Sequence, residues 1–199
     1  MRLLYGISLI ALLSLSAQSQ VIVVVSNPAH YESVTRSALA EAVMALEAEA
    51  GGKVLEIRFA LDEDEEPSFE AVLAADDALI YMRAYSLTGV LEVLEVAELP
   101  PWMGGWTLTA YMKSIAKAEV PLAAAIVLAE EAEDAPAIAA GLANPLRPTT
   151  AVLAYNIELI RGDRPVRVAI DAQTGRRIAN PEALYESWTP TELARRAIR

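Results

Sequence analysis

Residues 155–175 read YNIELIRGDRPVRVAIDAQTG, which is the pattern of an antiparallel β-hairpin followed by a turn. Apolar and polar side chains alternate along residues 155–159, and this period of two predicts a strand with one buried face. Residues 161–164 supply glycine and aspartate for the hairpin tip. Residues 166–171 then predict the returning strand, so the segment is expected to form half of a small antiparallel sheet.

The same pattern occurs a second time, 86 positions earlier in the chain. Residues 69–89 read FEAVLAADDALIYMRAYSLTG, so that Phe69 corresponds to Tyr155 and Gly89 to Gly175 without a gap. A fixed-spacing repeat of this kind identifies one supersecondary unit that is used twice.

A helix is predicted before each hairpin, at residues 39–44 and at residues 122–127, with an offset of 83 positions. Thr35 or Ser37 can cap the first helix at its N-terminus, and Gly51-Gly52 can end it. The repeated unit is therefore one helix followed by strands.

These patterns predict an α+β fold of two tandem repeats, each an α-helix packed on a small antiparallel β-sheet. Residues 100–105, PPWMGG, punctuate the chain between the copies. We expect each repeat to fold as a separate unit. The expected division is residues 21–100 for the first repeat, 101–120 for a linker with a helix, 121–182 for the second repeat and 183–199 for a C-terminal tail helix.

Residues 1–19 have the pattern of a secretory signal peptide: a basic residue, a short apolar run over residues 3–15, and small residues near the cut. Cleavage is expected after Ser19, or else after Ala17. The apolar run is shorter than the roughly 18–20 residues that a membrane span requires, which argues against an uncleaved anchor. We therefore expect a periplasmic or secreted protein without stable membrane insertion after cleavage.

The amino-acid composition limits the kinds of site and partner that the chain can have. It contains no cysteine, which excludes disulfides, zinc–thiolate sites and a lipid-modified cysteine. The formal net charge is −11 and becomes −12 when Arg2 is removed with the signal peptide. An acidic protein of this kind is a poor partner for nucleic acid or anionic lipid, and the charge instead favours solubility or a basic partner.

The ordered series of features resembles the PepSY domain family, whose pattern is an alanine-rich helix, a Tyr-x-Val-type strand, and a second strand ending in Asp-x-x-Thr-Gly. The second repeat matches through residues 155–158 and 168–175. The first repeat matches through its helix, residues 51–54, Phe69 and Thr88-Gly89, but it has Tyr85 where the second has Asp171.

The resemblance implies an exported, non-catalytic module that binds another envelope protein. In that family such domains occur in propeptides of thermolysin-type metallopeptidases and are thought to restrain peptidase activity. We therefore expect a protein that modulates a peptidase, uses no cofactor and is not an enzyme. In the second repeat, Leu142–Ala143 or the far end of Val166–Ile170 is expected to present an open sheet edge to the partner.

Two groups of residues are candidates for a site. The first is the pair of turns, which we interpret as defining the repeat, because an aspartate can accept backbone N–H groups and glycine accepts a positive φ. The second group could contact a partner, or else pack between the two repeats. The turn residues are Asp171, Thr174, Gly175, Thr88 and Gly89, and the candidate contact residues are Trp102 and Trp106.

Other motifs are interpreted as ordinary surface features. His30 is the single histidine and lacks the nucleophile motif of a hydrolase. The acidic residues 62–66 could bind calcium, but they lack the glycine-containing loop of an EF-hand. The tripeptide at residues 161–163 resembles an adhesion motif and also suits a hairpin tip.

The alternative function is a periplasmic small-ligand-binding protein of a transport system. The strand-like residues 21–25 followed by a helix favour it. It would require parallel βαβ lobes, whereas the repeat predicts a helix followed by an antiparallel hairpin.

Overall fold

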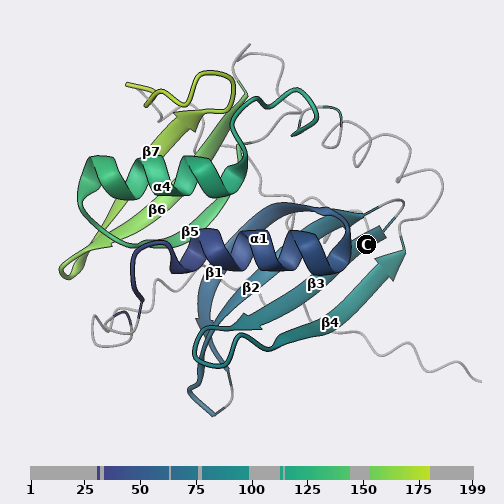
Figure 1. The fold of residues 1–199 in the computed structure, drawn as a ribbon. Helices are drawn as coiled ribbons and strands as arrows, with labels where there is room; N and C mark the ends of the chain where they lie inside the picture. Colours follow the sequence, from purple (N-terminus) through teal and green to yellow (C-terminus); the bar gives the residue numbers. More distant parts are fainter. Residues whose placement is uncertain are drawn as a thin grey trace, which may run out of the picture.

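The computed structural model describes residues 31, 34–62, 64–75, 78–98, 113, 115–143 and 153–179. These residues form two long helices and seven strands (Figure 1). The first part contains α1 (Ala38–Ala50), β1 (Lys53–Leu61), β2 (Pro67–Ala75), β3 (Ala78–Tyr85) and β4 (Leu91–Glu98), and the second contains α4 (Leu122–Glu133), β5 (Ala137–Leu142), β6 (Ala154–Arg161) and β7 (Arg164–Asp171).

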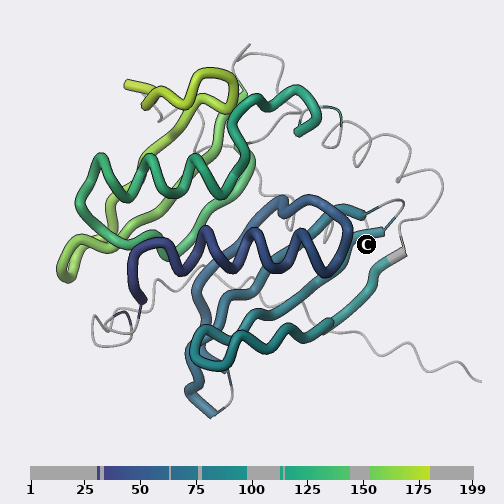
Figure 2. Tube along the Cα trace, viewed as in Figure 1, coloured from purple at the N-terminus to yellow at the C-terminus, as the bar shows by residue number. Residues whose placement is uncertain are grey.

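The seven strands form one antiparallel sheet in the order β4-β3-β2-β1-β5-β6-β7. Helices α1 and α4 lie side by side across the same face of this sheet (Figure 2). The α+β class and the antiparallel hairpins are confirmed. The expectation that each repeat has its own small sheet is corrected, because β1 of the first copy pairs directly with β5 of the second.

The junction between the copies is a local two-fold axis. Ile57 on β1 lies opposite Ala140 on β5, and these two residues are equivalents under the 83-residue offset. The flanking pairs, Glu56 with Gly141 and Arg58 with Ala139, are exchanged by the same operation. Each copy therefore contributes the same edge, as in an isologous dimer interface.

One glutamate in each helix ties that helix to the strand that follows it. The Oε1 atom of Glu47 accepts the Val54 N–H at 3.1 Å, and Oε1 of Glu130 accepts the Ala137 N–H at 2.8 Å. Both bonds join equivalent residues. Glu130 is only 2% exposed, and its Oε2 also accepts the Ser37 N–H, at 2.9 Å, before α1. The second carboxylate therefore links the two copies.

The helix ends follow the predicted positions but not entirely the predicted chemistry. Gly51 ends α1 in the left-handed conformation, with φ of 65°, as expected. Its equivalent, Asp134, ends α4 with φ of 52°. Ser37 occupies the N-cap of α1, but its side chain makes no capping bond there. The bond from its N–H to Glu130 supplies the polar partner at this end instead.

The core lies between the two helices and the sheet. Tyr155 is buried in it, and its hydroxyl donates to the Val120 carbonyl at 3.0 Å. Burial and the nearby Glu47 carboxylate raise the pKa of Tyr155 to about 12. The largest fully buried side chains include Leu39, Val43 and Leu46 on α1, Ile126 on α4, and Leu55, Ile57, Leu73, Met82, Ile157, Leu159 and Val168 on the strands.

Several predictions lie outside the described residues. They are the signal peptide at residues 1–19, the strand at residues 21–25 and the tail helix at residues 183–199. Of the helix predicted in the linker, Lys113 and residues 115–117 are described: Lys113 and Ile115 are helical, and residues 116 and 117 form a turn. Within the described part of the chain, none of the helices has the length and apolar character needed to cross a membrane.

Candidate protein-binding edge

The repeat-defining turns have the same backbone in both copies. Gly89 donates to the Tyr85 carbonyl at 2.9 Å, and Gly175 donates to the Asp171 carbonyl at 2.8 Å. Both glycines have φ of 69°, the left-handed conformation that glycine accepts without steric cost. The threonine hydroxyls of Thr88 and Thr174 each lie 3.4 Å from the N–H two residues later.

The two turns differ in the side chain that precedes them. Asp171 Oδ1 accepts the N–H groups of Gln173 and Thr174 at 2.8 and 3.0 Å, which is the predicted local bond. Tyr85 forms the equivalent turn without a carboxylate. Its hydroxyl instead donates to Glu92 at 3.2 Å. The turn therefore forms with or without the aspartate.

The five turn residues do not come together as one site. Thr88 and Gly89 follow β3, and Asp171, Thr174 and Gly175 lie at the end of β7, near the other end of the sheet. Each turn leads the chain back along the preceding strand. Ala84 then pairs with Leu91, and the equivalent Ile170 pairs with Arg177. In the first copy this return continues as the full strand β4.

The second copy does not present the predicted edges. Leu142 belongs to β5, which lies inside the sheet between β1 and β6, so that prediction is wrong. The far end of β7 is covered by the returning chain: Ile178 donates to the Ala169 carbonyl at 2.8 Å, and Asp171 donates to the Arg176 carbonyl at 2.9 Å. Pro165 and the exposed Arg164 lie at its near end, and residues of these kinds discourage further strand pairing.

Strand β4 is the open edge among the described residues. It is one of the two terminal strands of the sheet, and it lies beside α1 but outside its cover (Figure 1). Val93, Leu94 and Val96 are 55%, 43% and 56% exposed. An antiparallel ladder uses only every second backbone group of an edge strand, so the remaining N–H and C=O groups of β4 point away from β3.

A β-bulge in β4 determines which of its side chains lie on each face of the sheet. Arg83 pairs with Glu92 and Tyr81 pairs with Glu95, so one residue of β4 is extra between them. Glu92 and Glu95 consequently share the sheet face that bears Tyr81 and Arg83. Val93 and Val96, which pair with Met82 and Ile80, lie on the helix-bearing face. The edge is thus acidic on one face and apolar on the other.

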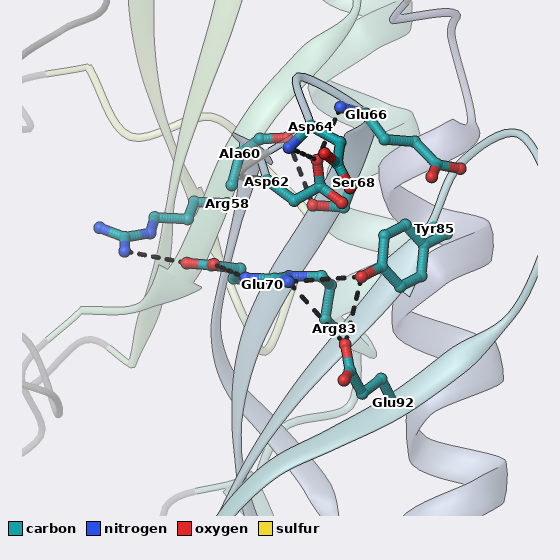
Figure 3. Close-up of polar contacts among 10 residues, drawn as sticks. All are labelled: Arg58, Ala60, Asp62, Asp64, Glu66, Ser68, Glu70, Arg83, Tyr85 and Glu92. Atoms are coloured by element: carbon teal, nitrogen blue, oxygen red, sulfur yellow. Dashed lines mark hydrogen bonds and ion pairs between the residues drawn. The ribbon is translucent and has the colours of Figure 1, made fainter.

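A row of charged side chains connects this edge with the middle of the sheet (Figure 3). Glu70 on β2 bonds Arg58 on β1 at 3.1 Å and Arg83 on β3 at 2.9 Å. Arg83 lies 3.8 Å from Glu92 on β4 and also contacts the Tyr85 hydroxyl at 3.4 Å. These residues are direct cross-strand neighbours, so the row joins four consecutive strands.

The acidic and basic side chains of this row stabilise one another's charged forms. Burial by itself would raise the pKa of Glu70, but hydrogen bonds and charge from Arg83 and Arg58 outweigh it and lower that pKa below its ordinary 4.5. Hydrogen bonds to Tyr85 and Glu70 raise the pKa of Arg83. Glu95 has no ion-pair partner among the described residues, so it is the uncompensated carboxylate of the edge.

Among the described residues, the other sequence candidates form ordinary turns. Asp62 Oδ1 accepts the N–H groups of Asp64 and Glu66 at 2.9 and 2.8 Å, which makes the acidic segment a turn closed by its own aspartate (Figure 3). The described residues contain no cluster of metal-ligating side chains, including here. Gly162 has φ of 63° at the tip of the β6–β7 hairpin. His30, Trp102 and Trp106 lie outside the described residues.

Within the described residues, fold and edge together describe a class of protein: two long helices on one face of an antiparallel sheet whose strand β4 forms an open, amphipathic edge. No family model matches this chain, and the search of curated proteins likewise gave no match. Among solved structures, a candidate lipoprotein of Clostridium difficile 630 is similar, with 13% identity and a TM-score of 0.41 over 69% of this chain and 88% of that chain. The PepSY family is therefore a resemblance carried by the motifs alone.

The pattern of residues 91–96 indicates a strand at β4, but nothing in the sequence marks that strand as the site. Residues 91–96 read LEVLEV, where two apolar residues interrupt the alternation. Such an interruption is typical of a bulge. That β4 ends the sheet is a property of the topology: β4 pairs only with β3 among the described strands, whereas the pairing of β1 with β5 closes the other edge of the first copy.

Proposed function

We propose that this protein is an exported, non-catalytic protein-binding module that modulates a peptidase or another envelope protein. The single observation that carries the proposal is the open edge of β4, with its exposed Val93 and Val96. An extended segment of a partner adds to such an edge as a further strand: backbone hydrogen bonds supply affinity and alternate side chains supply specificity.

The partner class rests on the sequence. The signal-peptide pattern places the protein with envelope proteins, and the PepSY-like motifs favour a peptidase among them. The antiparallel pairing of every described strand supports this function over the small-ligand-binding alternative, which required parallel βαβ lobes. The carboxylates and guanidinium groups of the charged row form ion pairs with one another, which supports a structural role for the row.

The test uses a proline at an outward-facing position of β4. The bond from the Tyr85 N–H to the Val90 carbonyl fixes the alternation of the β3–β4 ladder and directs the Val93 N–H outward. Val93→Pro removes this donor and adds a ring to the edge while leaving the pairing with β3 intact. Val93→Thr is the matched control, because it keeps the N–H and the β-branched shape.

The purified mature protein is titrated into envelope extract that degrades casein, at low and at physiological salt. We expect the native protein and Val93→Thr to change the rate at micromolar concentration, and Val93→Pro to have little effect. Equal effects of the two variants would exclude the β4 edge. No effect of the native protein, together with a small molecule retained in native mass spectrometry, would favour the ligand-binding alternative.

A further inference from the structure

We propose that the segment received by β4 is an extended strand with lysine or arginine at every second position and apolar residues between them. This inference rests on the proposed function and specifies its partner. It follows from three features of β4: the charge of its acidic face, the spacing of its two glutamates, and the apolar character of its other face. Each feature restricts the sequence of the incoming strand separately.

The charge of the partner follows from the acidic face of β4. Glu92 is already bonded to Tyr85 and faces Arg83, whereas Glu95 has no basic partner among the described residues. Both carboxylates are exposed at the edge. A basic side chain on the incoming strand would pair with each, and opposite-charge cross-strand pairs stabilise an antiparallel sheet. On the inner side, Arg83 of β3 shows this arrangement opposite Glu92.

The spacing of the basic residues follows from the bulge. Glu92 and Glu95 are three positions apart in β4, but their partners on β3, Arg83 and Tyr81, are only two apart. A regular incoming strand on the outer edge would face Glu92 and Glu95 in the same way as β3 does, so its basic residues belong at positions i and i+2. The residues between them then face the same side as Val93 and Val96, which requires apolar side chains.

A second copy of the chain does not satisfy these requirements. Two β4 strands paired about a two-fold axis at the bulge would set Glu92 of one copy against Glu95 of the other. Like charges directly opposite destabilise strand pairing. The net charge of −11 adds a general repulsion between copies. The edge therefore selects a basic partner.

The experiment measures binding of three fluorescein-labelled peptides by anisotropy: VKVKVKV, its rearrangement VKKVVKV, which has no two lysines at positions i and i+2, and VEVEVEV. We expect VKVKVKV to bind the native protein at least about tenfold more tightly than either of the others, because it alone places both opposite-charge pairs in register. Its affinity should fall with added salt, since the pairs are exposed.

Charge reversal on the protein tests the same pairs from the other side. Glu92→Lys combined with Glu95→Lys should reverse the order of VKVKVKV and VEVEVEV. The matched control, Glu49→Lys combined with Glu131→Lys, makes the same change in net charge at exposed helix positions and should leave the order unchanged. Because Glu92 also bonds Tyr85, Glu95→Lys alone serves as a second variant that leaves that bond in place and should weaken VKVKVKV several-fold.

The outcomes separate this inference from the function on which it rests. Equal affinities for VKVKVKV and VEVEVEV, both lost in Val93→Pro, would leave strand addition standing and overturn the basic pattern. Binding of VKVKVKV that is unaffected by Val93→Pro would overturn the edge itself. An unchanged peptide order in the charge-reversed protein, with its folding verified by circular dichroism, would also overturn the inference.

Discussion

Gly89 and Gly175 have the same left-handed backbone, with φ of 69° at each, but they lie in different surroundings. A Cβ atom added to Gly89 would meet nothing within 4 Å. The same atom on Gly175 would lie 3.2 Å from Leu128 Cδ1 and 3.6 Å from Val120 Cγ2. Substitutions at these two glycines therefore separate two costs that usually occur together, backbone strain and side-chain crowding.

We expect Gly89→Val to lower the free energy of unfolding by about 1–2 kcal/mol, the cost of a left-handed conformation for a branched residue. Gly175→Val should cost about 1 kcal/mol more, because it also crowds the end of the second repeat. Urea denaturation of both variants measures the difference. Equal losses of stability in the two variants would show that Leu128 and Val120 move aside at no energetic cost.

At the scale of the elements, the helices are attached to the sheet by carboxylates, of which that of Glu130 is buried, as well as by apolar packing. Glu130 joins α4 to β5 through the Ala137 N–H and reaches the Ser37 N–H before α1. Glu47 makes only the first of these bonds to backbone. Hydrogen bonds from backbone N–H groups to a charged acceptor stabilise more than neutral ones, and losing an acceptor leaves buried donors unpaired.

We expect Glu130→Gln to reduce the free energy of unfolding by about 2 kcal/mol, because the amide can accept only one of the two N–H groups. Glu131→Gln is the control, since the neighbouring side chain is exposed, and it should change stability by less than about 0.5 kcal/mol. Urea denaturation at neutral pH compares the two. A loss at Glu130 no larger than at Glu131 would contradict the role of the buried carboxylate.

The charged row across β1–β4 predicts a specific pH dependence. The pKa of Glu70 is lower in the folded protein than its ordinary 4.5, so the ionised row contributes stability that is present above that value. The contribution is lost as the pH falls through the lowered pKa. Glu70→Gln should therefore destabilise the protein at pH 7, and the difference from the native protein should shrink below pH 4.5. Denaturation curves across this pH range measure the difference in stability. A difference that does not change with pH would contradict a stabilising role for the ionised row.

At the scale of the whole molecule, the two repeats behave as the halves of a dimer in one chain. Gly141 lies at their junction, where a Cβ atom would lie 3.1 Å from the Leu55 carbonyl oxygen and 3.5 Å from Glu56 Cα. Both contacts are to backbone of the other copy, which cannot move aside as a flexible side chain could. The glycine thus permits the close approach of β5 to β1.

We expect Gly141→Val to lower the free energy of unfolding by about 2 kcal/mol, because it forces β1 and β5 apart. Ala139→Val, two residues away on the same strand, is the control and should cost less. Hydrogen exchange should show the amides of β1 and β5 losing protection first in Gly141→Val. Unchanged protection at that junction would show that the copies are held together mainly by α1 and α4.

The local elements could be predicted from the sequence because their signals lie within a few residues of one another. The period of two in residues 155–159, the glycine ends of helix and turn, and the fixed offsets between copies predict the hairpins, the helices and the repeat. LEVLEV at residues 91–96 predicts strand β4 in the same way. The acidic charge likewise requires no structure, and the signal peptide at residues 1–19 stays a prediction from the sequence.

Only the tertiary structure decided that the copies share one sheet and that β4 is its open edge. The first fact depends on the pairing of Ile57 with Ala140, which are far apart in the chain, and nothing in the sequence of either strand indicates the other. The second fact depends on the strand order, in which β4 pairs only with β3. Backbone hydrogen bonds join any two strands of suitable length, so side-chain patterns specify which face of a strand is buried but not which strand lies beside it. The free edge, and with it the candidate site, follows from the strand order, which makes β4 terminal, and from the returning chain, which covers the far end of the other terminal strand, β7.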